Sequence, residues 1–526
     1  MTPRERRWIW AFSAFLALIT TLPYLVAAFT SGPDHAFSGF LIGVYDGNSY
    51  IAKMLSGSQG AWLFKTPYTT YPQRGALAFL PYLLLGKLVP GGNHTGLVLL
   101  YHVFRLAAIP FAVWATYDFT AYFVEPTSWR RWITFLATLG GGLGWIALAI
   151  GGPLLSSSLP LAFISPETFG FLSFYSLPHL VVARGLLLMG LLDYARSFSQ
   201  AKLAWRAGIW LGLLIFVQPL SLVPAGAVLG AMALAAAGAG LPARNWALLR
   251  KVIGRGLAAL AIPIPLMLGL LLSYLTDPFV RIWASQNLIL SPPAVYYLLA
   301  YGLVLVPAFW GARRLLGHGF SPDLLPLLWV LLVPVLAYAP LVVQRRLAEG
   351  SWVAWLVLAA IGLQSLGVRW RRSARIAILA LSLPASFLIV AGGVTTATSL
   401  SAPAFLPVHE TEVFAWLAQH AEPNSVVLAA IPVANAAPAW APVRVVVGHG
   451  PESALFHKRA SQVDAFFGDA LTPAERMTLL SDLGVDYIIV GPDERGSSAW
   501  MAASLSPAYT AGGFSVWRAA SQGAAQ

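Results

Sequence analysis

The chain has 526 residues, of which 58% are hydrophobic and only 10% are charged, whereas about 25% of the residues of a soluble protein are charged. With a mean hydropathy of +0.70, this composition excludes an ordinary soluble protein and indicates a membrane protein. The net charge of +12 comes mainly from loops on one side of the predicted membrane region, so it suits anionic lipid and not nucleic acid. The absence of cysteine excludes disulfides, thiolate metal sites and cysteine nucleophiles.

Apolar segments long enough to cross a bilayer follow one another along residues 1–396. We predict an α-helical polytopic membrane domain with about eleven transmembrane helices, near residues 8–28, 98–117, 132–150, 177–195, 207–222, 223–241, 256–273, 294–311, 325–341, 352–367 and 376–396. Lys and Arg gather in every second gap, at residues 4–7, 130–131, 196–206, 244–255, 313–314 and 369–375. Because basic loops stay in the cytoplasm, we predict a multi-pass protein of the cell (plasma) membrane with its N-terminus inside and its C-terminus outside.

The first outer loop, residues 29–97, is long for a connection between adjacent spans, and loops of that size usually carry function. Its apolar segment 76–89 is short and contains a proline, so we expect an interfacial or partly inserted helix. Asp46 stands before a short helical stretch and is a candidate catalytic acid; its structural alternative is a helix cap. Tyr50 and Lys53 follow as candidate substrate contacts, although such residues also occur in an ordinary interfacial belt.

Ionisable residues also mark the second outer loop and the span that follows it. Glu167 is the only charged residue in an otherwise apolar stretch, His179 begins the next span, and Arg184 lies inside it. An intramembrane ionisable group is costly and is by default a functional candidate, as is Arg105 in the second span. For Arg184 the structural alternative is an ion pair or a snorkelling side chain.

The segment Gln344-Arg345-Arg346 breaks the charge pattern, because it places two adjacent arginines in a short outer loop. Forked guanidinium donors match phosphate oxygens. We therefore predict a phosphate site at these three residues, with a lipid-headgroup anchor as the alternative.

After residue 396 the composition changes, and residues 397–526 are predicted to form a small extracytoplasmic α/β domain. We expect helices over residues 410–420, 454–467 and 473–483, and strands over residues 425–430, 443–447, 486–490 and 514–518. His449 and Glu452 follow the second of these strands and are candidates to line a carbohydrate or acceptor surface. His449 and His457 lack a metal-binding spacing.

The candidate polar groups Asp46, Glu167, His179, Arg345 and Arg346 all fall on the predicted outer side. A carboxylate there suits a general base that deprotonates an acceptor hydroxyl, and the arginines suit a departing phosphate. No energy-rich nucleotide is available outside the cell, so the natural donor is a polyprenyl-phosphate sugar. We predict no tightly bound cofactor; a divalent metal is possible but no motif indicates one, and the acceptor is a protein, a lipid or a glycan.

The topology, the long first outer loop and the outer C-terminal domain together resemble the GT-C glycosyltransferases, and especially bacterial proteins similar to the dolichyl-phosphate-mannose protein mannosyltransferases. The residues that carry this resemblance are Asp46–Met54, Gly140–Trp145, Pro166-Glu167, Pro178-His179, Gln344–Arg346 and Val447–His449. The resemblance implies that Asp46 is the base of an inverting transfer. Many members have a second acid beside it, where this chain has Gly47, and Glu167 is the candidate for that second role.

Two other classes remain compatible with the sequence. A transporter or lipid flippase would also use intramembrane Arg and His and broken helices, but the chain shows no repeated halves. A non-catalytic membrane scaffold or sensor would use the outer α/β domain for binding, and the absence of an acid beside Asp46 favours it.

Overall fold

The computed structural model of the protein describes residues 1–151, 158–317 and 319–519. The chain divides into two compact units. Unit 1 comprises residues 1–22, 104–269 and 288–392, and unit 2 comprises residues 23–103, 270–287 and 393–526. The predicted outer loop 29–97 and the C-terminal residues therefore belong to one compact unit.

Unit 1 is helical. Four helices run from one unit into the other, namely α1 (Pro3–Thr30), α4 (His94–Phe123), α13 (Pro263–Thr276) and α19 (Pro384–Ser399). The remaining helices of unit 1 are α5 (Thr127–Leu139), α6 (Gly144–Ile150), α7 (Leu161–Ile164), α8 (Gly170–Ser176), α9 (Pro178–Arg196), α10 (Leu203–Val217), η2 (Pro219–Ser221), α11 (Leu222–Gly240), α12 (Trp246–Leu260), α15 (Ala294–Leu316), η3 (Pro322–Leu324), α16 (Leu325–Ala337), η4 (Gln344–Ala348), α17 (Ser351–Leu363) and α18 (Val368–Ser382).

Every predicted span falls on one of these helices or on a broken pair of them. Within the described residues, seven helices are long and apolar enough to cross a membrane, or up to nine if each of two bent pairs is one span. The bent pairs are α5 with α6 and α12 with α13, and the two other predicted spans coincide with shorter apolar helices. The total of eleven and the orientation remain predictions.

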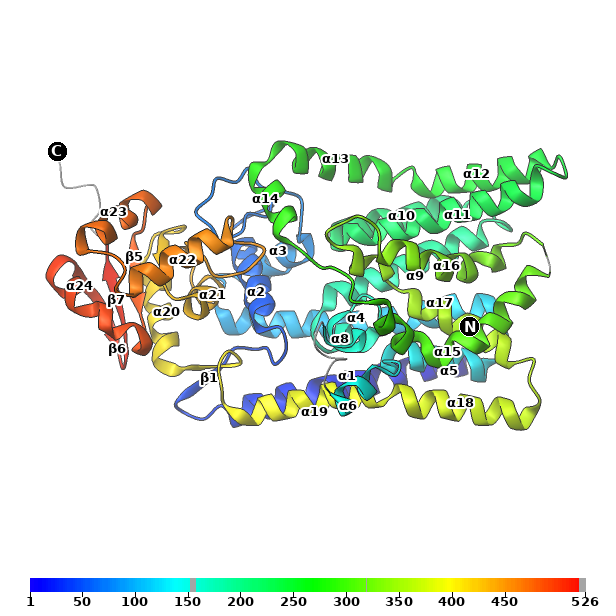
Figure 1. Ribbon diagram of the computed structural model, residues 1–526, viewed down its shortest axis with the longest axis horizontal. Helices are drawn as coiled ribbons and strands as arrows, with labels where there is room; N and C mark the ends of the chain where they lie inside the picture. Colours follow the sequence, from blue (N-terminus) through cyan, green and yellow to red (C-terminus); the bar gives the residue numbers. More distant parts are fainter. Residues whose placement is uncertain (152–157, 318, 520–526) are drawn as a thin grey trace. The chain divides into compact units, whose positions relative to one another are not determined.

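Glycines allow the helices of unit 1 to approach closely, as membrane helices commonly do. α15 packs along α17 (Figure 1). A Cβ built on Gly311 would overlap the carbonyl oxygen of Leu358, and one on Gly362 would overlap that of Pro307. The two backbones are therefore in contact at these glycines.

Unit 2 combines an α/β domain with segments of the first outer loop. Its elements are β1 (His35–Phe37), α2 (Val44–Ser58), α3 (Leu80–Gly86), α14 (Pro278–Gln286), β2 (Phe405–Pro407), α20 (Val408–His420), β3 (Val426–Leu428), α21 (Ile431–Trp440), β4 (Arg444–Val445), α22 (Phe456–Phe467), α23 (Pro473–Leu483), β5 (Tyr487–Val490), η5 (Pro492–Ser497), α24 (Ser498–Ser504), β6 (Ser506–Ala511) and β7 (Phe514–Arg518). The seven-residue α3 lies within the segment 76–89; at 1.5 Å per residue it is about 10 Å long, too short to span a bilayer.

A five-stranded sheet in the order β4-β3-β5-β7-β6 forms the centre of unit 2. β3 is parallel to β4 and β5, whereas β7 is antiparallel to β5 and β6. All four residues of β5 are buried, as expected when helices cover both faces of a sheet. Tyr487 and Ile489 pack with α20 and α21, and Ile488 and Val490 pack with α22, α23 and α24.

The predicted elements of residues 397–526 are all present, with ends shifted by at most a few residues. Five elements were not predicted: β2, α21, η5, α24 and β6. The first outer loop adds to this domain in two ways. β1 pairs antiparallel with β2, and α2 packs against α21.

Candidate functional site

Asp46 lies in the first turn of α2, inside the helix and not at its cap. The N-cap residue is Gly43, in the left-handed conformation with φ 61°, which glycine adopts without strain. The Oδ1 atom of Asp46 lies 3.0 Å from Nε2 of His449. The Asp46 side chain is 58% exposed, whereas that of His449 is only 9% exposed. A solvent-facing carboxylate is thus held by a buried histidine, at a helix N-terminus that favours negative charge.

The loop that carries His449 is fixed by hydrogen bonds to neighbouring elements. The hydroxyl oxygen of Ser453 accepts from the backbone N–H groups of Gly448 and His449, each at 3.1 Å. The side-chain amide of Asn435, on α21, donates to the Gly448 carbonyl at 2.9 Å. A Cβ on Gly448 would lie 2.6 Å from the carbonyl oxygen of Ala434, so only glycine allows this approach.

Lys53 is fully buried, where the sequence suggested a contact for substrate. Its Nζ lies 2.6 Å from Oε1 of Glu452, and neither side chain is more than 6% exposed. The hydroxyls of Ser49 and Thr66 also donate to Glu452, each at 2.8 Å. Buried charges require this kind of pairing. The resulting cluster of Ser49, Lys53, Thr66 and Glu452 joins α2 to the His449 loop.

Burial and pairing shift the ionisation of this cluster. Desolvation lowers the pKa of Lys53, and the Glu452 carboxylate partly opposes that effect. Burial alone would raise the pKa of Glu452, but the charges of Lys53 and His449, with hydrogen bonds from Lys53 and Ser49, lower it overall. Burial also raises the pKa of Tyr68, whose hydroxyl donates to the Asn435 carbonyl at 2.9 Å.

Tyr50, another predicted substrate contact, stacks on Tyr82 of α3 with ring centroids 4.6 Å apart. The structure adds Ser49, Thr66, Tyr68 and Asn435 to the residues proposed from the sequence. Helical spacing could have indicated Ser49, which lies three residues after Asp46. Asn435 had no such signal, because α21 contains two prolines within an alanine-rich stretch and resembles a loop.

Unit 1 contains a second cluster of predicted site residues. Nε of Arg346 lies 3.1 Å from Oε1 of Glu167, and Nε of Arg184 lies 3.6 Å from Oε1 of Glu349. A terminal nitrogen of Arg184 donates to the backbone carbonyls of Pro166 and Glu167, at 2.7 and 2.8 Å. Arg184 and Glu349 are both buried. The structural alternative considered for Arg184, an ion pair, is therefore observed, and Glu349 is its partner.

The other predicted site residues of unit 1 are close in sequence to the residues of this second cluster. Gln344 and Arg345 belong to η4 with Arg346, and His179 is the second residue of α9 and is 9% exposed. Nε of Arg345 is buried and, among the described residues, has no hydrogen-bond partner. The predicted site residues thus form two clusters, one in each compact unit.

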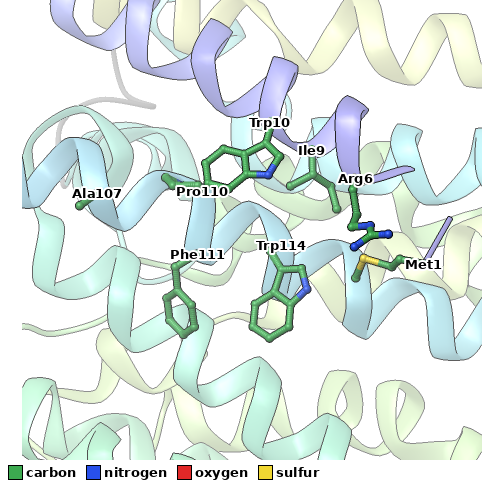
Figure 2. Close-up of a pocket in the computed structure, with 8 residues that line it drawn as sticks. All are labelled: Met1, Arg6, Ile9, Trp10, Ala107, Pro110, Phe111 and Trp114. Atoms are coloured by element: carbon green, nitrogen blue, oxygen red, sulfur yellow. The ribbon is translucent and has the colours of Figure 1, made fainter. Parts of the chain in front are cut away.

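Metal-binding groups and pockets bear on the chemistry that these residues can perform. Over residues 1–151, 158–317 and 319–519, no group of three or more His, Cys, Asp or Glu side chains could hold a metal ion. Figure 2 shows a pocket of about 360 Å³ in unit 1, between α1 and α4. Trp10, Phe111 and Trp114 line it, together with Met1 and Arg6. Its apolar lining offers no group for acid–base chemistry.

Comparisons with known proteins identify the fold. No family model and no curated protein matches the chain. The apo oligosaccharyltransferase of Archaeoglobus fulgidus superposes over 95% of this chain and 72% of its own, with a TM-score of 0.58 and 12% identity. The archaeal oligosaccharyltransferase AglB from the same organism was solved in complex with an inhibitory peptide and a dolichol-phosphate. It superposes over 95% of this chain and 71% of its own, with a TM-score of 0.56 and 12% identity. Arabinofuranosyltransferase AftD from Mycobacteria gives a TM-score of 0.58 at 13% identity, over 98% of this chain and 40% of its own.

These neighbours are glycosyltransferases of the GT-C fold. The chain therefore has the GT-C fold, and the resemblance noted in the sequence is confirmed at that level. At 12–13% identity the likeness establishes the fold, and the chemistry has to be argued from the residues.

Proposed function

We propose that the protein is a membrane glycosyltransferase that moves a sugar from a polyprenyl-phosphate donor to an acceptor hydroxyl at the outer face of the membrane. The observation that carries this proposal is the Asp46 carboxylate, which is solvent-facing and oriented by His449. Such a carboxylate suits a general base, because it must reach a substrate while keeping a defined direction. The GT-C fold supports the proposal, as does the dolichol-phosphate bound to the archaeal neighbour.

In the proposed reaction Asp46 removes the proton of the acceptor hydroxyl as that oxygen attacks the anomeric carbon of the sugar. The new carbon–oxygen bond forms as the bond from the anomeric carbon to the donor phosphate breaks, with inversion. The electron pair leaves with the polyprenyl phosphate, and the proton stays on the Asp46 carboxyl. Hydrogen-bond donors of the protein that stabilise the negative charge developing on the phosphate then lower the barrier to transfer.

We assign the phosphate contact to Gln344, Arg345 and Arg346. Arg345 suits this role best, because its guanidinium Nε has no hydrogen-bond partner among the described residues. Arg346 is already engaged with Glu167, which would fix the direction of its guanidinium. The ion pair of Arg184 with Glu349 and the bonds from Arg184 to the loop carbonyls would hold Glu167 in place. Glu167 itself remains a candidate for the second acid.

The test is glycosyl transfer by the purified protein in detergent from a panel of polyprenyl-phosphate sugars. Asp46→Asn should lower kcat by about 10²- to 10⁴-fold, the usual contribution of a general base, and leave donor binding intact. Asp34→Asn, at an exposed acid of the same loop, is the matched control. Arg345→Ala should weaken donor binding by about 10- to 100-fold, because a hydrogen bond to a charged group contributes roughly 1.5–3 kcal/mol.

The matched control for Arg345 is Arg281→Ala, at an exposed arginine of α14. A wild-type protein that binds no lipid-phosphate sugar would contradict the proposal, as would equal turnover in the Asp46 and Asp34 variants. Dependence of solute or lipid movement on Arg184 and Arg105, without turnover, would instead indicate a transporter.

A further inference from the structure

We propose that His449 is the positioning residue of the base: it donates its Nε2–H to Oδ1 of Asp46 and thereby directs Oδ2 toward the acceptor hydroxyl. This inference rests on the proposed function and deepens it. It assigns His449 a role through Asp46, in place of the direct substrate contact expected from the sequence.

The side chains of Asp46 and His449 differ in burial, as expected when a buried group orients an exposed catalytic base. The side chain of Asp46 is 58% exposed, and Gly47, the residue after it, has no side chain that could orient the carboxylate. His449, at 9% exposure, is restrained by its surroundings, including the ring of Tyr68 at a centroid distance of 5.5 Å. An ordered donor therefore helps to hold an exposed carboxylate in one orientation, and such ordering is what keeps a reacting group aligned.

The surroundings of the second ring nitrogen select the tautomer. Nδ1 of His449 is buried and has no hydrogen-bond partner among the described residues. A proton on Nδ1 would leave a buried donor without an acceptor, which is costly. A neutral imidazole carries its proton on one nitrogen only. The geometry thus places the proton on Nε2, where Asp46 accepts it.

The loop around His449 keeps the donor at a constant distance. Ser453 and Asn435 hold its backbone, and three residues later Glu452 is tied to Lys53 of α2. The helix that carries the base and the loop that carries its donor are therefore fastened together at two points. This is the supporting shell that a precisely placed catalytic group needs.

Amide substitutions separate this role from a merely structural one. The glutamine amide nitrogen reaches the position of Nε2, whereas the shorter asparagine reaches only that of Nδ1. His449→Gln should therefore retain kcat, while His449→Asn and His449→Ala should lower kcat by about 10²-fold, as expected for a misplaced reacting group, with the donor Kd unchanged. His420→Ala, at an exposed histidine of α20, is the control and should match the wild type.

Equal kcat in the Gln and Asn variants would overturn the inference, as would an unchanged kcat in the Ala variant or a loss confined to donor binding. A second readout does not depend on turnover. In protein with ¹⁵N-labelled histidine, the NMR signal that disappears in the His449→Gln variant belongs to His449. We expect this signal to show a proton on Nε2 and to shift in the Asp46→Asn variant. An Nδ1–H tautomer would refute the positioning role even if the wild type transferred no sugar, whereas absent turnover with the expected tautomer would contradict only the proposed function.

Discussion

Replacing Lys53 by Met removes the ammonium group that pairs with Glu452 and leaves a buried carboxylate behind. Breaking a buried ion pair in this way costs about 3–5 kcal/mol. Glu452 keeps the hydroxyl donors of Ser49 and Thr66, both at 2.8 Å, so we expect a loss near 3 kcal/mol. For a unit of this size that loss corresponds to a fall in Tm of about 6–12 °C.

The direction of the pH dependence gives this prediction a second, independent signature. In the wild type the folded pKa of Glu452 is lowered, so its stabilisation is present above the unfolded pKa and is lost as pH falls through the folded pKa. Without Lys53, desolvation remains as the largest influence and should raise the folded pKa above the unfolded one. The variant should then gain stability relative to the wild type as pH falls from 8 to about 5.

Thermal unfolding in detergent, followed by tryptophan fluorescence, measures both effects. Lys458→Met, at an exposed lysine of α22, is the matched control. The double variant Lys53→Met/Glu452→Gln should recover part of the lost stability, because it removes the unpaired charge. The reasoning is refuted if the Lys53 variant is as stable as the Lys458 variant, or if lowering the pH destabilises it as much as the wild type.

Two further predictions concern the C-terminal domain and the helical unit. Burial, with a smaller effect of Glu494, raises the pKa of Glu410 from 4.5 to about 7; its stabilisation is therefore fully present below pH 4.5 and is lost as pH rises through 7. Between pH 5 and 8 the wild type should lose on the order of 2–3 kcal/mol more stability than Glu410→Gln, and equal slopes in pH-dependent unfolding would contradict this. Gly311→Ala should separate α15 from α17 at the Leu358 carbonyl and cost about 1–3 kcal/mol. Gly302→Ala, whose Cβ would meet its nearest neighbour at 3.8 Å, should unfold like the wild type, and equal Tm values for the two variants would show that the close packing contributes nothing.

Local pattern was sufficient for most elements of the fold. The alternation of short Val/Ile runs with amphipathic helices predicted β5 and α23 within a residue or two, because their burial and capping are local properties. α23 has its capping box at Thr472 and Glu475 and ends at Gly484 in the left-handed conformation. α21 was not predicted, because its prolines indicate a loop unless packing against α2 and α20 is known.

The partners of the site residues could not be predicted in the same way. Asp46 and His449 are 403 positions apart in sequence, and Lys53 and Glu452 are 399 apart. No local spacing encodes a contact over that distance. The sequence identified Asp46, Lys53 and His449 as candidates but assigned Lys53 to substrate, because a lysine in an outer loop is expected to be exposed. Its burial follows only from the packing of α2 in unit 2.

The spacing of residues within α2 connects the Asp46–His449 contact with the Lys53–Glu452 ion pair. Asp46, Ser49 and Lys53 stand at positions i, i+3 and i+7, which share one face of a helix. That face meets the loop after β4, where His449 contacts the first of the three and Glu452 contacts the other two. Two contacts about 10 Å apart along the helix axis fix both the rotation and the axial position of α2. The buried ion pair is therefore part of what orients Asp46, so the Lys53 and His449 variants should not behave as independent changes.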